Sequence, residues 1–288
     1  MAAKKRELVV KANQLVEARY RLHLVEHQLI VYAISRAREE EKGLVAGSWL
    51  TIDPAKFAEQ FGTDKKNAYR QIQEAANNLW HRAITLYDID PETGEDRVIE
   101  TRWIAAKARI DKAERVQLMF APLVIPYIKR LSKDVGNFTR YYIENIAGMT
   151  SVHAVRMYEM LLQYRKVEKR EFEVDVLKSH LGIEKEYPRI ADFKRWVIDE
   201  AVKQINEHSD IKVAYTQRKL GRTVTHFIFD IKSKPESKQA ATASKPIKLP
   251  DSVTAPTIRN ADSAIVKNAR AAALAAVQSG KQKSGAEN

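Results

Sequence analysis

The chain has 288 residues, and its 49 lysines and arginines against 37 aspartates and glutamates give a formal charge of +12. This balance favours a polyanionic partner, because basic side chains that neutralise phosphates release condensed counterions. The absence of cysteine excludes disulfide frameworks, cysteine-ligated zinc and thiol catalysis, and no apolar run approaches the roughly 20 residues of a membrane span, so we expect a cytoplasmic protein.

The N-terminal half begins with two predicted helices. Apolar residues recur at helical spacing over residues 22–38, which predicts one long amphipathic helix. In the next run, T-I-D-P, Asp53 can cap a helix and Pro54 can be its first residue. A short helix is therefore expected up to Phe61, where Gly62 can end it.

One more helix and several strands are expected next. Residues 64–81 have helical periodicity, and residues 84–89 alternate as a strand that turns at D-P-E-T-G and returns over residues 98–104. Further elements are expected downstream: strands at residues 109–110 and 115–120, and a helical connector over residues 121–132.

The same order of elements recurs in the second half. Ser151 can cap an amphipathic helix that runs to Tyr164, and a strand-like segment comes next at residues 171–174. The helix end L-K-S-H-L-G at residues 177–182 then matches F-A-E-Q-F-G at residues 57–62. Each copy continues into a long helix and a hairpin, so we predict an α+β chain with two tandem winged-helix domains related by pseudo-symmetry.

This repeat divides the chain into three parts. We expect an N-terminal winged-helix domain over residues 1–135, with DNA contact and dimerisation surfaces, and a C-terminal winged-helix domain over residues 136–232. Residues 233–288 carry nine basic against four acidic residues among many Ala, Ser and Pro. That composition predicts a disordered basic C-terminal tail, with an alanine-rich stretch over residues 262–278 that could be helical.

The helix over residues 64–81 has the clearest candidate face for DNA. Lys66, Arg70, Gln73 and Asn77 fall together opposite its apolar stripe, at i, i+4, i+7 and i+11. Basic and amide side chains read guanine and adenine in the major groove, and each good bidentate pair contributes about 1 to 3 kcal/mol of discrimination. The alternative interpretation is an ordinary solvated helix face.

The second copy offers a helix with a basic beginning, over residues 188–208. Arg195 projects away from the apolar stripe, and Arg189 stands at the N-terminal end, where recognition helices contact bases and backbone amides favour phosphate. Lys194 falls nearer the apolar side and would extend its stem outward to reach solvent. We therefore predict that the first two turns contact DNA.

The two predicted hairpins differ in charge. Residues 84–104 carry six acidic residues against two arginines, whereas the second hairpin has the tip Q-R-K-L-G-R with Arg218, Lys219 and Arg222. Phosphate would repel an acidic wing, while a basic wing suits the backbone or the minor groove. We therefore predict that the second domain is the main DNA anchor and that the acidic hairpin faces solvent or protein.

One motif points to an enzyme instead. His23, Glu26 and His27 form H-x-x-E-H, the inverzincin arrangement in which two histidines on a helix bind zinc in a metal-dependent hydrolase. The pentapeptide arises easily by chance and lies in a predicted core helix, so packing is the preferred interpretation. The 11 tyrosines allow a tyrosine-dependent nickase in principle, but no His-hydrophobic-His motif accompanies them, and there is no P-loop. We expect no catalytic residue, metal or cofactor.

Three segments resemble the iteron-binding replication initiators of theta-replicating plasmids. They are L-V-E-H-Q-L-I-V-Y-A-I at residues 24–34, Y-P-R-I-A-D-F-K-R-W at residues 187–196 and G-R-T-V-T-H-F-I-F-D-I at residues 221–231. The resemblance covers roughly residues 8–232. It implies two winged-helix domains and a monomer that binds repeated origin sequences and brings in host replication proteins, the host initiator and helicase. It also implies a homodimer, in equilibrium with the monomer, that binds an inverted repeat and represses the initiator's own gene.

By position, the resemblance assigns DNA contacts to three groups of basic residues: Arg189, Lys194 and Arg195 in the second recognition helix, residues near Lys65, Lys66 and Arg70 in the first, and Arg218, Lys219 and Arg222 in the second wing. His27 stands where relatives commonly have Gln, which further weakens the zinc hypothesis. A winged-helix transcriptional repressor remains an alternative, because residues on a DNA face do not reveal whether binding leads to replication or only to repression.

Overall fold

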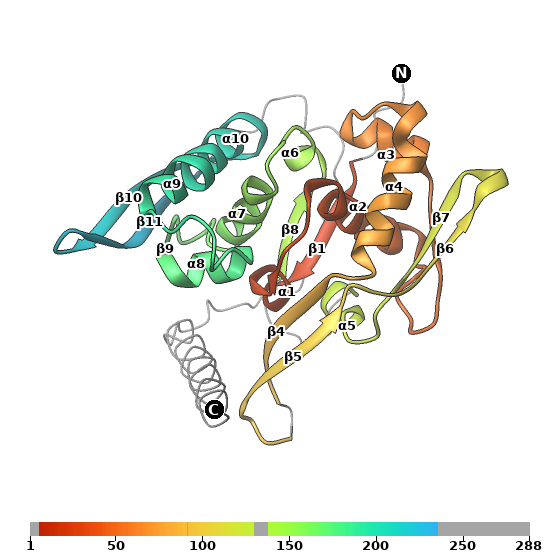
Figure 1. The fold of residues 1–288 in the computed structure, drawn as a ribbon, viewed down its shortest axis with the longest axis horizontal. Helices are drawn as coiled ribbons and strands as arrows, with labels where there is room; N and C mark the ends of the chain where they lie inside the picture. The colour runs from red at the N-terminus through yellow and green to blue at the C-terminus, as the bar shows by residue number, and fades with distance from the viewer. Residues whose placement is uncertain (1–5, 91, 130–137, 236–288) are drawn as a thin grey trace, which may run out of the picture.

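The computed structural model describes residues 6–90, 92–129 and 138–235, and within them the fold is α+β with two winged-helix units side by side (Figure 1). Each unit has the order helix, strand, two helices and a β-hairpin. Residues 236–288 lie outside this part of the chain, so the predicted tail and its alanine-rich helix stay predictions.

The first unit contains the three predicted helices: α2 (Leu24–Glu40), α3 (Pro54–Phe61) and α4 (Lys65–Leu79). The carboxylate of Asp53 accepts a hydrogen bond from the backbone N–H of Ala55 at 3.0 Å, and Gly62 ends α3 with φ +67°. Both predicted ends of α3 are therefore confirmed. Asp64 caps α4 in the same way, and the buried stripe of α4 packs against α2 and α3.

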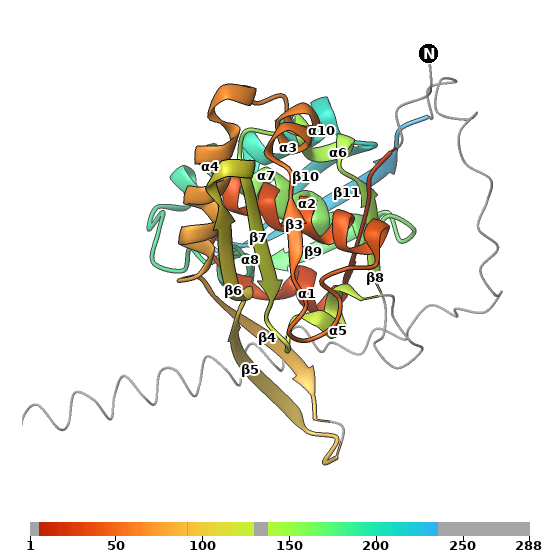
Figure 2. The same ribbon diagram turned by 90° about the vertical axis from the view of Figure 1, so that its right-hand side faces the viewer.

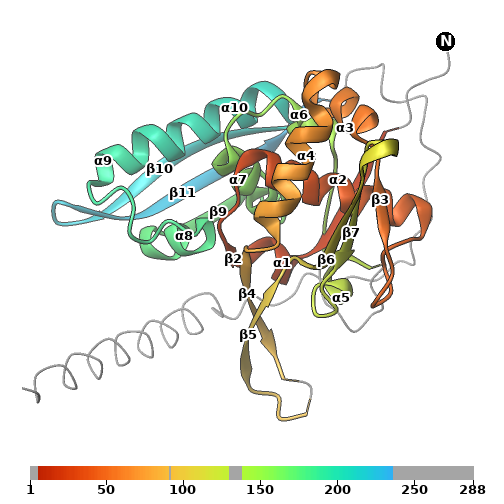
Figure 3. The same ribbon diagram turned by 45° about the vertical axis from the view of Figure 1, so that its right-hand side comes forward.

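The sheet of the first unit is antiparallel, with the order β3-β7-β6. These strands are β3 (Leu50–Ile52), β7 (Arg115–Phe120) and β6 (Ile104–Ile110). A single turn, η1 (Asp111–Ala113), closes the β6–β7 hairpin. Both strands contact α4 and run beside it (Figure 3).

The second unit repeats this arrangement with α7 (Val152–Leu162), β9 (Lys169–Glu173), α8 (Val174–Leu181), α9 (Ile190–Phe193), η3 (Lys194–Asp199), α10 (Glu200–His208), β10 (Ile211–Leu220) and β11 (Thr223–Ser233). Its sheet has the order β10-β11-β9. The three segments α9, η3 and α10 follow one another without a break, as the sequence predicts for residues 188–208, but η3 is wound as a π-helix.

The wing of the first unit is not the hairpin that the sequence favours. In the second unit, β9 precedes the paired helices and lies beside β11, the last strand of the hairpin. In the first unit β3 precedes the helices and lies beside β7, so β6–β7 is the corresponding wing. The prediction of an acidic wing is therefore wrong, because the acidic hairpin belongs to another sheet.

That acidic hairpin consists of β4 (Ala83–Ile89) and β5 (Asp96–Arg102) and is an addition to the winged-helix pattern. It pairs with β2 (Arg19–Tyr20) in the order β2-β4-β5 and projects from the body of the molecule (Figure 2). The hairpin thus stands apart from the wing that accompanies α4.

A two-stranded sheet joins segments far apart in the sequence, since β1 (Leu8–Ala12) pairs with β8 (Phe138–Tyr142). This pairing spans the domain boundary predicted at residue 135. Three short helices, α1 (Asn13–Glu17), α5 (Ile125–Ile128) and α6 (Glu144–Ala147), complete the described elements. Of the connector predicted over residues 121–132, the structure describes residues 121–129, and among these the α-helix is α5, where Pro126 fits the first turn.

A cluster of buried charges joins the two units. The Nζ of Lys11 on β1 lies 2.6 Å from the Oε1 of Glu159 on α7, and both side chains are fully buried. Arg156, also on α7, donates to the backbone carbonyls of Ala18 at 2.8 Å and of His180 at 2.9 Å. Around these groups the buried apolar side chains of both units form one continuous core.

Gly182, at the end of α8, lies against the first unit. It has φ +68°, and a Cβ at this position would lie 2.8 Å from the carbonyl oxygen of Tyr20. Both the backbone conformation and the space therefore require glycine. This close approach fixes α8 of the second unit against β2 of the first.

Candidate nucleic-acid interface

The predicted base-reading residues of the second unit lie at the beginning of its recognition helix. Arg189 precedes α9, its side chain is 81% exposed, and its Nε donates to Asp192 at 2.6 Å. Arg195 is exposed on η3, whereas Lys194 is half-buried, in keeping with its position near the apolar stripe. The three cationic side chains therefore occupy the first two turns, at the helix end where a recognition helix contacts base edges.

Trp196 is a neighbour of these residues that the sequence analysis does not select. Its side chain is 56% exposed, and the guanidinium of Arg195 lies 4.7 Å from its ring centroid. An exposed Trp beside an Arg gives this helix an apolar contact as well as a charge. The signal in the sequence is an aromatic residue within a basic run, outside the apolar stripe.

The second wing presents its basic tip to solvent. Arg218, Lys219 and Arg222 are exposed at the end of the β10–β11 hairpin, and Arg218 forms an ion pair with Glu171 on β9. Further along, the hydroxyl of Tyr215 on β10 donates to Asp199 on η3. Burial and this bond raise the pKa of Tyr215, so the phenol stays a donor and ties the wing to the recognition helix.

In the first unit, Lys65, Lys66 and Arg70 are exposed along the N-terminal half of α4. A hydrogen bond ties this helix to the turn of its wing, because the hydroxyl of Tyr69 donates to Asp111 in η1 at 2.7 Å. The bond to Asp111 raises the pKa of Tyr69. Both units thus use a tyrosine–aspartate bond between the recognition helix and the wing.

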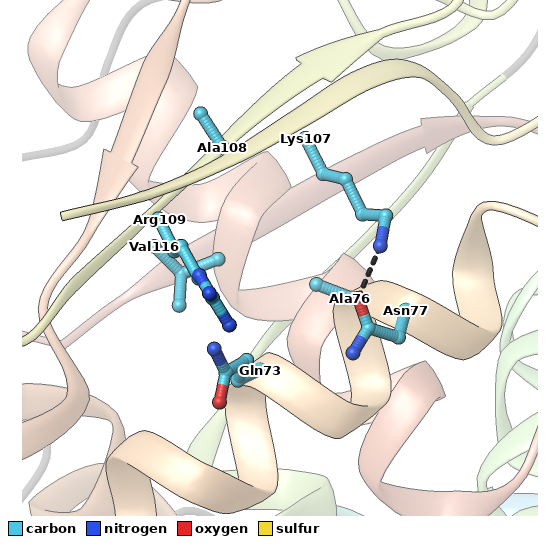
Figure 4. Close-up of a pocket in the computed structure, with 7 residues that line it drawn as sticks. All are labelled: Gln73, Ala76, Asn77, Lys107, Ala108, Arg109 and Val116. Atoms are coloured by element: carbon cyan, nitrogen blue, oxygen red, sulfur yellow. Dashed lines mark hydrogen bonds between the residues drawn. The ribbon is translucent and has the colours of Figure 1, made fainter. Parts of the chain in front are cut away.

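Gln73 and Asn77 line a shallow groove between α4 and β6 (Figure 4). Its volume is about 280 Å³, and the other polar lining residues are Lys107 and Arg109 on β6. The Nζ of Lys107 donates to the amide oxygen of Asn77, and Arg109 points toward Gln73. The groove is lined by two exposed cations and two amides, a donor set that suits phosphate oxygens.

The sequence analysis missed Lys107 and Arg109 because it did not assign them to a wing. The hairpin from Ile104 to Phe120 carries four basic residues and two acidic ones, so the wing of the first unit is basic as well. The available signal was the alternation A-K-A-R, which places both cations on one face of a strand.

Comparisons with known proteins agree with this geometry. Residues 8–162 match the family model described as "Initiator Replication protein, WH1", and residues 173–231 match "Initiator Rep protein, WH2". The chain therefore belongs to the initiator replication protein family. Initiators of this family are DNA-binding proteins without catalytic activity.

Individual relatives extend the comparison. This initiator is 25% identical over 232 residues to a "Replication initiation protein" of Escherichia coli, covering 78% of this chain and 70% of that protein. It is 21% identical over 232 residues to an "Uncharacterized 27.6 kDa protein" of Escherichia coli, covering 77% and 93%. Its fold matches the crystal structure of the Pi initiator protein in complex with iteron DNA, with TM-score 0.59, 19% identity, and 81% and 100% of the two chains covered.

The residues of the zinc motif have structural roles in this initiator. Glu26 accepts a hydrogen bond from the backbone N–H of His23 at 2.9 Å and forms an ion pair with Arg82 at 2.9 Å. His23 is exposed, whereas His27 lies in the core beside Lys11, so the two histidines do not share a site. The family assignment and this geometry reject the hydrolase alternative.

Two further properties of the described residues concern metal binding and membrane association. Over the described ranges of the initiator, no three His, Asp or Glu side chains converge as metal ligands. None of the helices in the same part of the chain is both long and apolar enough to cross a bilayer.

Proposed function

We propose that this protein starts the replication of a plasmid by binding repeated sequences, or iterons, at its origin. The observation that carries the proposal is that each unit places a recognition helix beside a basic hairpin. Two such readers in one chain can contact successive grooves of a duplex, as winged helix-turn-helix proteins do. The bound DNA of the Pi initiator, a protein of the same fold, supports the choice of ligand.

The proposed contacts fall into two kinds. Base edges are read by Arg189, Lys194 and Arg195 in the second unit, and by Lys65, Lys66, Arg70, Gln73 and Asn77 in the first. Phosphates are held by Arg218, Lys219 and Arg222 of the second wing. To these we add Lys107 and Arg109 of the first wing, whose groove leads from β6 to the amides of α4.

Within this proposal, residues 136–232 remain the main DNA-binding domain and residues 1–135 the domain of additional DNA contact and dimerisation. The packing of α7 against α10 supports assigning α7 to the second domain. The sequence predicted the second domain as the main DNA anchor because the first wing was expected to be acidic. That reason does not hold, since the first wing is basic. The longer hairpin and the cations that begin α9 and η3 support the ranking instead.

Autorepression by a homodimer and recruitment of host replication proteins are further parts of the proposal. The β4–β5 hairpin is suited to protein contacts, because it projects from the body and carries six acidic residues that phosphate would repel. Host initiator and helicase are the partners that replication initiation requires, and the cytoplasm is where they act.

A transformation assay tests the proposed function. A plasmid that carries the candidate origin but lacks this gene is introduced into cells that supply the protein from another replicon, and colonies are counted. We expect colonies with the wild-type protein and with Arg140→Ala, an exposed arginine on β8 outside the proposed surface, and a strong loss with Arg195→Ala. A repressor without initiator activity would silence a reporter placed behind its promoter and yield no colonies in any arm.

A further inference from the structure

Leu220 lies at the tip of the second wing and is the most exposed large apolar side chain in the described part of the chain, at 78%. The tip is a two-residue turn in which Gly221 has φ +59°, a conformation that leads Leu220 and Thr223 back into one pair. A single exposed apolar side chain is common on protein surfaces, but one at the end of a hairpin that extends beyond its sheet is placed to insert into a partner.

The charge around Leu220 identifies the kind of partner. Arg218 is paired with Glu171, but the structure shows no ion pair for Lys219 or Arg222 with any residue that it describes. An apolar side chain between two exposed cations fits a ligand that offers an apolar surface between two anions. The stacked bases of DNA, flanked by phosphates, have this pattern.

The hairpin is long enough to reach those bases. β9 pairs with β11 only as far as His226, so the sheet has three strands up to that residue. Thr223 lies three residues beyond it, in the part of the hairpin that has two strands. At about 3.3 Å per residue the unsupported tip extends about 10 Å, and the minor groove is about 7.5 Å deep. A bulge between Arg218 and Lys219 increases the local twist and turns the tip relative to the base of the hairpin.

We propose that Leu220 is an apolar wedge that enters the minor groove and partly unstacks one base step, while Lys219 and Arg222 hold the phosphates on either side. The minor groove is only about 6 Å wide, so entry requires a step that widens and bends easily, such as a pyrimidine–purine step. The inference rests on the proposed function and adds DNA bending by the second wing.

The test uses the full-length chain and a duplex that this protein enriches from a random-sequence pool. Donor and acceptor dyes at the ends of the duplex report bending, and 2-aminopurine placed at successive positions under the wing reports unstacking. The variants are Leu220→Ala, Leu220→Met and Lys219→Ala, with Leu123→Ala as the matched control, because Leu123 is also exposed but lies outside the wing. All measurements are made at protein concentrations that saturate the duplex.

We expect the wild-type protein and Leu123→Ala to bend the duplex and raise 2-aminopurine fluorescence at one step. Leu220→Ala should lose both signals while bound, Leu220→Met should retain them because Met is also an apolar wedge, and Lys219→Ala should need more protein to saturate but keep the bend. Equal bending by Leu220→Ala and the wild type overturns the wedge and leaves the proposed function standing. Enrichment of no duplex by the wild-type protein overturns both.

Discussion

Replacing His27 by Gln should make the stability of this protein less sensitive to acid. His27 lies on α2 with 1% of its side chain exposed, and its Nε2 is 3.5 Å from the Nζ of Lys11 and 3.5 Å from Glu159. Arg156 also faces it, and the ring of Tyr20 meets it edge-on. Burial lowers the pKa of His27 from 6.5 to about 4, although Glu159 opposes the shift.

The sign and size of the effect come from the two pKa values. The unfolded chain takes up the proton as the pH falls through about 6.5, whereas the folded chain takes it up only near pH 4. The contribution of His27 is therefore complete above pH 6.5 and is lost as the pH falls toward 4. The whole difference corresponds to about 3 kcal/mol of unfolding free energy, of which about 2 kcal/mol is lost by about pH 5.

Urea unfolding followed by far-ultraviolet circular dichroism checks this prediction. The free energy of unfolding is measured between about pH 7.5 and about pH 5 for the wild type, for His27→Gln and for His81→Gln, an exposed histidine outside the cluster. We expect the wild type and the control to lose about 2 kcal/mol more than His27→Gln over this range. Parallel pH profiles for the wild type and His27→Gln would refute the reasoning, whatever their difference in absolute stability.

Three further predictions concern the DNA surface and the first unit. Arg195→Ala should reduce specific affinity by about 1 to 3 kcal/mol, measured as the ratio of specific to nonspecific binding; an unchanged ratio rules out base reading. Lys107→Ala should weaken binding to all sequences and lower the slope of log affinity against log salt by about 1, whereas Lys42→Ala, an exposed lysine just after α2, should not. A loss confined to one base position contradicts a phosphate contact. Asp53→Ala should lower the free energy of unfolding by about 1 kcal/mol through loss of the α3 cap, and a urea midpoint equal to that of the wild type argues against the cap.

The elements set by local chemistry were predictable from the sequence. Asp53, Pro54 and Gly62 define α3, because a capping carboxylate, a proline in the first turn and a left-handed glycine act on their immediate neighbours. The long second recognition helix and the tip at Gly221 were found for the same reason. The polar stripe of α4 followed from helical periodicity alone.

The sequence order misled the assignment of the first wing. A hairpin directly follows α4, and nothing local distinguishes it from a wing. The distinction lies in which strand pairs with β3, and that partner, β7, is more than sixty residues away along the chain. Hydrogen bonds between distant strands depend on the whole packing of the unit, so a local pattern does not specify them.

The sequence by itself determined that two winged-helix copies follow one another and that the second carries a basic helix and a basic tip. Only the tertiary structure decided that Lys107 and Arg109 line a groove with Gln73 and Asn77, and that His27 is buried beside Lys11 and Glu159. The reason is physical: periodicity and capping act over one or two turns, whereas burial and strand pairing bring together residues far apart in the chain.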